Sequence, residues 1–360
     1  MSHALIAIAL FVVTFAVSAF AVWKSIPLAH RLGMLDQPAP DRVHQKPKPR
    51  AGGPAMLVAF LLGVGLTFAF NVERFTPEVE RVALLAIGAS FVAFVMFYDD
   101  ALGIAPGPKL LLQIIAALIV VLPRFRGEHH GIILDRFNNP FGGEVELPLL
   151  IAVGFTVFWI VGMMNTINWV DGLDGLAGTV TFVACLILFI HTYFWPRGDP
   201  QFTISLLPLV LGAAVLGFLP FNWFPSKIIM GDSGAMFLGF VLGIISIIGG
   251  AKIATALLAL GLPILDVAWL ILSRSARRRS PGARDLGHLH HRLLEFGWTQ
   301  PQVVLFVGGI SLVFGLLGLL LPTRELKLVA IGVLGLVILA SVVAIARRTE
   351  VENKKTSRAH

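Results

Sequence analysis

Residues 203–220 read TISLLPLVLGAAVLGFLP, a run without a charged side chain. A second apolar run, residues 234–250, follows after the short polar segment KIIMGDS at 227–233. A helix that crosses a bilayer needs about 20 mostly apolar residues, so each run is long enough for one crossing. The stretch therefore predicts two membrane-spanning helices joined by a loop in which polar groups are concentrated.

The same alternation extends over the 360-residue chain, of which 56% is hydrophobic and 14% charged. A soluble domain carries about 25% charged residues, so the composition excludes a soluble enzyme. The single cysteine, Cys185, excludes an internal disulfide. We predict an all-α polytopic membrane protein with one transmembrane catalytic domain, residues 1–346, and a polar tail, residues 347–360. The roughly eleven predicted spans are 4–23, 53–70, 81–97, 109–123, 148–164, 176–195, 203–220, 234–250, 253–273, 301–321 and 326–346.

The distribution of basic residues orients the chain. An odd number of spans places the two termini on opposite sides, and most of the 28 Lys and Arg residues fall on one side. The positive-inside rule makes that side cytoplasmic, with the amino terminus outside and the carboxyl tail inside. The net charge of +7 is then an orientation signal rather than a nucleic-acid surface. Between spans four and five, residues 124–147 predict a small external β-hairpin around a turn-forming cluster.

Polar residues gather in the five loops on the cytoplasmic side. Each loop precedes a helix whose amino terminus would point at the cytoplasm, and such ends favour phosphate. Gly52 and Gly53, after a basic run spaced by prolines, would let the backbone approach a ligand closely. The candidate site residues are Arg50 in loop one, Asp99, Asp100 and Lys109 around loop two, Asn165, Asn168, Asp171 and Asp174 in loop three, Asp232 in loop four, and His288, His290, His291 and Arg292 in loop five.

The acidic residues suggest chemistry on anions. Paired acids at a span end need water, a cation or a partner, so one of Asp99 and Asp100 can serve as base or metal ligand while the other anchors Lys109. Asp171 and Asp174 would share a face if that segment is helical. An acid between glycines suggests an oxygen ligand for Mg²⁺, which commonly takes one or two carboxylates plus phosphate oxygens.

Three histidines next to Arg292 can be neutral ligands, proton carriers or phosphate donors. The leucines around them predict a short amphipathic helix on the membrane, in which the histidines could also be incidental. Thr299 and Gln302 then match a capping box that opens span ten.

In their order along the chain, these motifs resemble the polyprenyl-phosphate N-acetylhexosamine-1-phosphate transferases over roughly residues 1–346. The motifs are Asp99-Asp100 with Lys109, Asn165-x-x-Asn168-x-x-Asp171-Gly-Leu-Asp174, Gly231-Asp-Ser-Gly and His288-x-His290-His291. The resemblance implies transfer of a sugar-1-phosphate from a UDP-sugar to a polyprenyl phosphate, with release of UMP. It further implies a requirement for Mg²⁺, with Mn²⁺ as a substitute, and an active site on the cytoplasmic face of a bacterial inner membrane.

The run around His288 and the eleven predicted spans resemble the branch that uses UDP-GlcNAc and undecaprenyl phosphate, and a homodimer is compatible with it. By resemblance, Asp232 binds the metal. Asp99 or Asp100 orients or deprotonates the lipid phosphate and can also reach the metal. The remaining candidates would bind substrate: the Asn and Asp residues of loop three the nucleotide, and the histidines with Arg292, Lys109 and Arg50 the diphosphate.

Three alternatives remain open. The pentapeptide branch of the same family makes the first lipid intermediate of peptidoglycan. A polytopic transporter would place its ionisable groups near the bilayer midplane. Gly231-Asp-Ser-Gly also fits the pattern around a nucleophilic serine in intramembrane proteases. Ala235 departs from the family pattern, where many members carry serine or threonine, without affecting Asp232.

Overall fold

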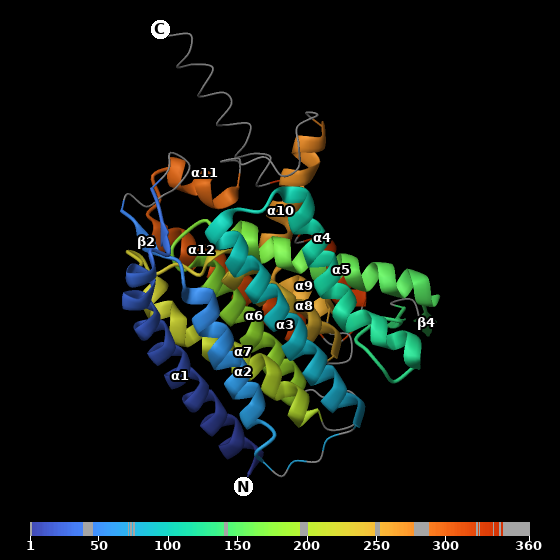
Figure 1. The fold of residues 1–360 in the computed structure, drawn as a ribbon. Coiled ribbons are helices and arrows are strands. Elements are labelled where there is room, and N and C mark those ends of the chain that lie inside the picture. The colour runs from blue at the N-terminus through green and yellow to red at the C-terminus, as the bar shows by residue number, and fades with distance from the viewer. Residues whose placement is uncertain are drawn as a thin grey trace.

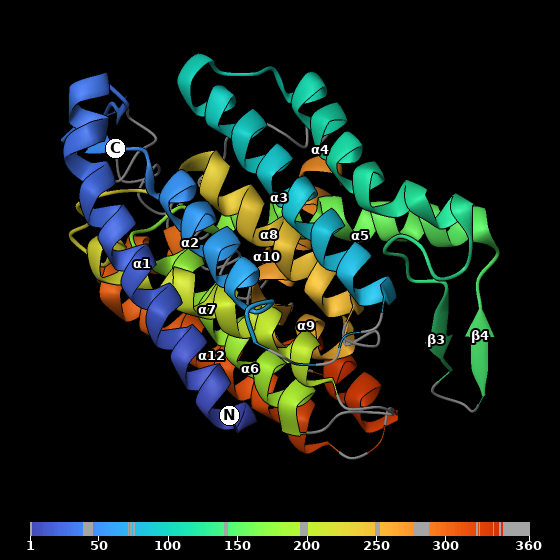
Figure 2. The ribbon, with the colours of Figure 1, turned by 60° about the horizontal axis from the view of Figure 1, so that its bottom comes forward.

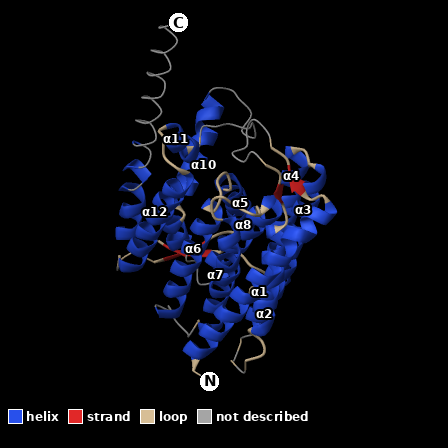
Figure 3. Cartoon of the chain, turned by 90° about the vertical axis from the view of Figure 1, so that its left-hand side faces the viewer, coloured by secondary structure: helices blue, strands red, loops and turns tan. Residues whose placement is uncertain are grey.

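The computed structural model describes residues 2–38, 46–70, 76–139, 143–194, 201–248, 253–276 and 288–321, together with Val72, Arg74 and parts of 323–340 (Figure 1). These residues form a bundle of helices with two very short ribbons of strand (Figure 3). The helices are α1 (His3–Leu32), α2 (Gly52–Leu66), α3 (Thr76–Leu102), α4 (Pro106–Val121), η1 (Leu122–Arg126), α5 (Leu149–Val170), α6 (Leu176–Phe194), α7 (Phe202–Asn222), α8 (Gly231–Ile248), α9 (Ile253–Ala259), α10 (Gly261–Ala276), α11 (Leu289–Glu295) and α12 (Gln300–Leu320).

The prediction of an all-α polytopic membrane protein is confirmed. Among the described residues, eight helices are long and apolar enough to cross a membrane, and the pair α9 and α10, bent by 80°, would make a ninth. The helix α2 is apolar but shorter, with 15 residues. The structure describes residues 326–333, 335–337 and 340 of the eleventh predicted span, 326–346, all of them helical, and the rest of that span lies outside the described residues. The count of eleven and the orientation in the membrane therefore stay predictions.

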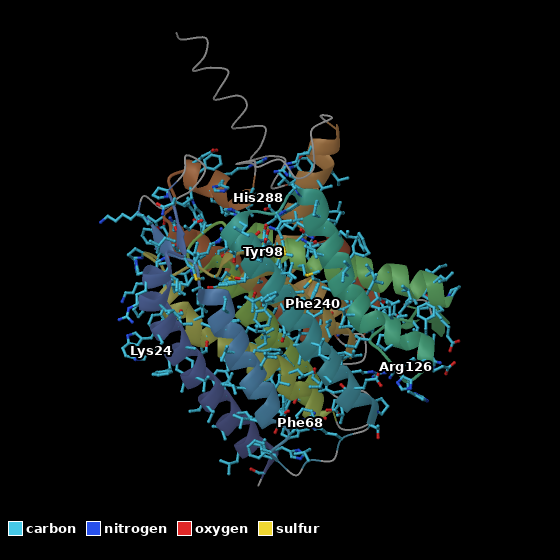
Figure 4. The ribbon with its side chains drawn as sticks, viewed as in Figure 1. Lys24, Phe68, Tyr98, Arg126, Phe240 and His288 are labelled. Carbon is cyan, nitrogen blue, oxygen red and sulfur yellow. The ribbon has the colours of Figure 1, made fainter. Side chains whose placement is uncertain are left out.

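The helix α8 forms the centre of the bundle. Almost every residue from Gly231 to Ile248 is buried, and α2, α3 and α5 pack around it. Phe240 of α8 lies in the middle of the molecule (Figure 4). The outer helices instead expose large apolar side chains such as Phe94, Phe158 and Leu320. Such a surface suits lipid, and the central position of α8 places its first residues where several polar loops converge.

The predicted β-hairpin is confirmed. Strands β3 (Arg136–Asn138) and β4 (Glu144–Glu146) pair antiparallel, with Phe137 opposite Val145, and the ribbon extends beyond the bundle next to α5 (Figure 2). A second ribbon, which the sequence did not predict, pairs β1 (Leu35–Asp36) with β2 (Lys48–Pro49). This ribbon folds loop one back on itself, so that the chain re-enters the bundle at Arg50.

The two ends of the bundle differ. His288 and Tyr98, the residue before Asp99, lie in the upper part of Figure 4, whereas Phe68 lies near the opposite end. The amino end of α1 is also at that opposite end (Figure 1). There, Arg74 pairs with the buried Glu78 at 2.6 Å. The polar loops of the candidate site are therefore confined to one end of the helical bundle.

Candidate active site

Loops one and four are held together by backbone hydrogen bonds. Ile229 donates to the carbonyl of Pro49 at 2.9 Å, while Gly52 and Gly53 donate to the carbonyls of Ile229 and Met230, each at 3.1 Å. A Cβ atom on Gly53 would collide with the backbone of Gly234. The close approach expected of the glycine pair is therefore made to the start of α8, not to a ligand.

Asp100, at the end of α3, caps the first turn of α8. Its Oδ1 accepts the N–H of Asp232 at 2.9 Å, and its Oδ2 accepts the N–H and hydroxyl of Ser233 at 3.1 and 2.7 Å. A carboxylate at this position satisfies donors that the first helical turn leaves free and complements the helix dipole. Both oxygens of Asp100 are thus engaged by the protein itself.

Two cations lie between the acids of α3 and Asp232. The Nη2 atom of Arg50 is 2.8 Å from Asp100 and 3.2 Å from Asp232. Lys109 at the start of α4 pairs with Asp99 at 2.7 Å and also contacts Asp232. Burial alone would lower the pKa of Arg50, but the negative charges of Asp100 and Asp232 outweigh it and raise that pKa, so the guanidinium stays charged.

The three acids differ in what their oxygens contact. Asp99 accepts the backbone N–H of Ile104 at 2.5 Å with Oδ1 and pairs with Lys109 through Oδ2. Asp232 has the most exposed side chain of the three, at 23%, against 7% and 4% for Asp99 and Asp100. The oxygens of Asp232 accept hydrogen bonds from the flexible cationic side chains of Arg50 and Lys109. Asp232 is therefore the carboxylate whose partners an arriving ligand could displace most easily.

Loop three is not helical where the two acids lie, so the condition under which they would share a helix face is not met. The helix α5 ends at Val170, and Asp171 is its C-cap. Burial, and next the negative charge of Asp232, raise the pKa of Asp171, which places this acid in the same electrostatic field as the cluster.

Asp174, the second acid of loop three, contacts loops one and four. It pairs with Lys48 at 2.8 Å and accepts the N–H and hydroxyl of Ser226 at 3.0 and 2.8 Å. It therefore links loops one, three and four. Ser226 was missed by the sequence analysis, because a serine in a connecting segment carries no pattern that distinguishes it.

The two asparagines of loop three, Asn165 and Asn168, belong to the last turns of α5 rather than to the turn that holds the acids. Asn165 donates to Gln113 of α4 at 2.7 Å and to the carbonyl of Val161 at 2.8 Å, so its amide is engaged inside the bundle. Asn168 is half-buried, about one turn nearer to Asp171. Substrate binding by these two residues stays a prediction.

The predicted short helix in loop five is confirmed as α11, and it brings the histidines onto loop three. A Cβ atom on Gly172 would overlap Nε2 of His290, so this glycine allows the imidazole to pack against the turn next to Asp171. Burial, and then the neighbouring His291 and His288, lower the pKa of His290 well below its usual range. His291 and Arg292 are half-buried on the same short helix.

One acid of this region was missed. Asp266 of α10 contacts His288 at 2.9 Å, yet it lies inside a run that the sequence predicts as an apolar span. An ionisable residue within such a span is itself a signal of function, and that signal could have identified it. The arginines at 277–279 and Arg284-Asp285 lie outside the described residues.

The expectation that helix amino termini face phosphate is not met at three of the helices. At α8 the first N–H groups donate to Asp100, and at α2 they donate to loop four. At α4 two of the first three residues, Pro106 and Pro108, have no N–H to offer. Positive charge at this end of the bundle is supplied by Arg50 and Lys109 instead.

Comparisons with known proteins agree with this arrangement. The model of the glycosyl transferase family 4 matches residues 82–250. The chain is 31% identical over 343 residues to a protein of Bacillus subtilis (strain 168) named probable undecaprenyl-phosphate N-acetylglucosaminyl 1-phosphate transferase, covering 92% of this chain and 91% of that one. It is 31% identical to a decaprenyl-phosphate N-acetylglucosaminephosphotransferase of Mycolicibacterium smegmatis, over 78% of this chain and 73% of the relative.

A phospho-N-acetylmuramoyl-pentapeptide-transferase of Staphylococcus saprophyticus is 29% identical, over 75% of this chain and 84% of the relative. The first of these similarities extends over nearly the whole of both chains. The family model itself covers loops two, three and four, and with them Asp99, Asp100, Asp171 and Asp232. The chain belongs to the glycosyl transferase family 4, as a polyprenyl-phosphate N-acetylhexosamine-1-phosphate transferase.

Proposed function

We propose that the protein transfers N-acetylglucosamine-1-phosphate from UDP-GlcNAc to undecaprenyl phosphate on the cytoplasmic face of a bacterial inner membrane. The observation that carries this proposal is the convergence of Asp99, Asp100 and Asp232 with two cations at one end of a lipid-exposed helical bundle. The relative from Bacillus subtilis, similar over nearly its full length, supports the choice of sugar and lipid. The product would serve as the first lipid-linked intermediate of a cell-envelope glycan.

In the proposed reaction, an oxygen of the lipid phosphate attacks the β-phosphorus of UDP-GlcNAc. A new P–O bond forms, the bond to the UMP oxygen breaks, and UMP leaves as the anion. Both reactants are anions, so alignment and positive charge are what the protein must supply. Arg50 and Lys109 are placed to supply that charge. Because a phosphate monoester has a second pKa of about 6, the attacking oxygen is largely ionised at neutral pH, and a strong base is not required.

The donor set around Asp232 fits a divalent cation with a preference for oxygen. Its carboxylate oxygens contact mobile side chains, and Asp171 is close enough for the two charges to interact. Mg²⁺ commonly binds one or two carboxylates together with phosphate oxygens, and Mn²⁺ prefers the same ligands. We assign Asp232 as the ligand of this ion, with Asp99 and Asp100 as positioning residues. When bound, the ion would neutralise charge on the diphosphate.

Two of the alternatives are disfavoured by particular contacts. Ser233, the nucleophile required by the protease interpretation, is fully buried, and its hydroxyl donates to Asp100. Because this hydroxyl is fully buried, a peptide bond has no access to it. The transporter interpretation requires ionisable groups near the middle of the membrane, whereas the acids here lie at helix ends on one side of the bundle.

A turnover assay tests the proposal. Purified protein in detergent, undecaprenyl phosphate and Mg²⁺ are given either UDP-GlcNAc or UDP-MurNAc-pentapeptide, and UMP release is measured. We expect release with UDP-GlcNAc and none after chelation of the metal. Release with the pentapeptide substrate alone would assign the protein to the peptidoglycan branch, and release with neither would refute the proposal.

A further inference from the structure

Asp266 is a buried acid of α10 that has no role in the proposed transfer reaction as described so far. It is 5% exposed, and both of its oxygens face the first turn of α11. Oδ2 lies 2.9 Å from Nδ1 of His288, and Oδ1 accepts the N–H of Leu289 at 2.9 Å. A carboxylate that is ionised only accepts hydrogen bonds, so in that state this contact requires the proton of the imidazole to be on Nδ1. The other ring nitrogen, Nε2, is then the one available to a ligand.

Two other aromatic rings pack against the imidazole of His288. His290 stacks on it with ring centroids 5.3 Å apart, and Trp169 of α5 meets it edge-on at 6.2 Å. Because His290 in turn packs against Gly172, the histidines form a continuous contact from Asp266 to the turn that holds Asp171. An acid in a membrane segment is costly, which favours a functional reason for its presence.

We propose that Asp266 is a positioning residue of the transferase site, which holds His288 in the tautomer protonated at Nδ1, so that Nε2 can accept a hydrogen bond from a hydroxyl or amide N–H of the sugar nucleotide. The inference rests on the proposed function for the identity of that ligand. Its physical basis is general, because the partner of one imidazole nitrogen sets the tautomer and the orientation of the other.

A metal site is the competing interpretation of the same side chains. Ligand atoms of Asp266, His288 and His290 lie within 4.8 Å of one another. However, both oxygens of Asp266 already accept N–H groups, and the 2.9 Å separation from Nδ1 is that of a hydrogen bond. The geometry therefore favours a positioned histidine over a coordinated ion.

The variant Asp266→Asn tests the role. Its amide oxygen can still accept from Leu289, but the group that then faces Nδ1 is an NH2 donor, so His288 is held in the opposite tautomer, with its proton on Nε2. We expect the KM for UDP-GlcNAc to rise about 10- to 100-fold, the usual effect of removing the partner of a functional histidine. The KM for undecaprenyl phosphate and the thermal midpoint should stay as in the wild type. Equal increases in both KM values would overturn the proposal.

A double-mutant cycle separates positioning from support of the fold. The amide of His288→Asn can still donate to Asp266 but lacks an equivalent of Nε2. In the His288→Asn background, Asp266→Asn should cause no further rise in the KM for UDP-GlcNAc, whereas additive losses would show that Asp266 acts independently of His288.

Glu78→Gln is the matched control. It removes a buried acid at the opposite end of the bundle, where Glu78 pairs with Arg74. It should lower the thermal midpoint and leave both KM values unchanged.

Two further readouts keep this test separate from the proposed function. Wild-type UMP release reports on the function itself. If the wild type does not turn over, UDP-GlcNAc serves as a binding probe: it should raise the thermal midpoint of the wild type more than that of Asp266→Asn, and equal stabilisation would overturn the proposal. Stoichiometric zinc in the purified wild type that is lost in Asp266→Asn would also overturn it, in favour of a metal site.

Discussion

Asp232 and Asp100 show how two neighbouring acids of one site can have different roles. The oxygens of Asp100 are engaged by the first turn of α8, while those of Asp232 contact Lys109 and Arg50. A carboxylate that caps a helix contributes mainly to structure. A carboxylate that pairs with long, flexible cationic side chains can exchange them for a metal ion or a substrate. The pair therefore allows stability and catalysis to be measured separately.

We expect Asp232→Asn to lower kcat by about 100-fold or more, because it removes the carboxylate assigned to hold the divalent cation that would neutralise charge on the diphosphate. The thermal midpoint should change little, since no backbone N–H donates to the lost charge among the described contacts of Asp232. UMP release and thermal unfolding in detergent measure the two effects. Wild-type kcat in this variant would remove Asp232 from the mechanism.

Asp100→Ala is the companion variant. It leaves the N–H groups of Asp232 and Ser233 and the hydroxyl of Ser233 without their acceptor. Loss of such a cap costs about 1–2 kcal/mol of stability. The variant should therefore have a lower thermal midpoint than Asp232→Asn. If the two midpoints are equal, Asp100 does not have the capping role assigned to it.

At the scale of the elements, the site depends on how closely α2 approaches α8. Gly53→Ala would insert a methyl group against the backbone of Gly234, where no flexible side chain can move away. We expect a loss of about 1–3 kcal/mol, as for other overpacked positions. Gly65→Ala, in the last turn of the same helix, meets open space and should be neutral or stabilising. Thermal unfolding of the two variants is the measurement, and equal stability would contradict the close packing.

The docking of α11 should respond to pH through His290. Its pKa is lowered by burial and by the neighbouring histidines, so the folded protein keeps it neutral. Below the ordinary pKa of about 6.5, the unfolded chain takes up a proton that the folded chain does not. The free energy of unfolding should therefore fall by up to about 1.4 kcal/mol per pH unit on further acidification. His290→Gln should lose this component in thermal unfolding across that pH range, and an unchanged pH dependence would contradict it.

Elements were easier to predict from the sequence than their contacts. Ten of the predicted spans coincide with a helix or a bent helix pair because apolar length alone identifies them. The 80° bend between α9 and α10 was not predicted, since Gly261 and Pro263 do not interrupt the hydropathy of the run. Likewise, the acids were identified as a group. The sequence did not predict that Asp100 caps α8. This cap depends on a contact between residues 132 positions apart, which no local pattern encodes.

At the scale of the whole molecule, the unequal ends of the bundle imply a fixed orientation in the membrane. Of the described basic residues, Lys48, Arg50 and Lys109 lie in the polar loops, at the end of the bundle that holds α11, so we expect that end to face the cytoplasm by the positive-inside rule. The proposed function requires the same orientation, because nucleotide sugars are cytoplasmic substrates. The β3–β4 hairpin, which joins α4 to α5 away from those loops, would then face outward (Figure 2).

Cysteine labelling can measure this orientation directly, because the native Cys185 is buried and should not react. Glu144→Cys places a thiol on the exposed hairpin strand β4, and Gln37→Cys places one on the exposed side of loop one. In intact cells, a membrane-impermeant maleimide should label Glu144→Cys alone. After permeabilisation it should label both. Labelling of Gln37→Cys in intact cells would reverse the orientation, and with it the face on which the proposed transfer occurs.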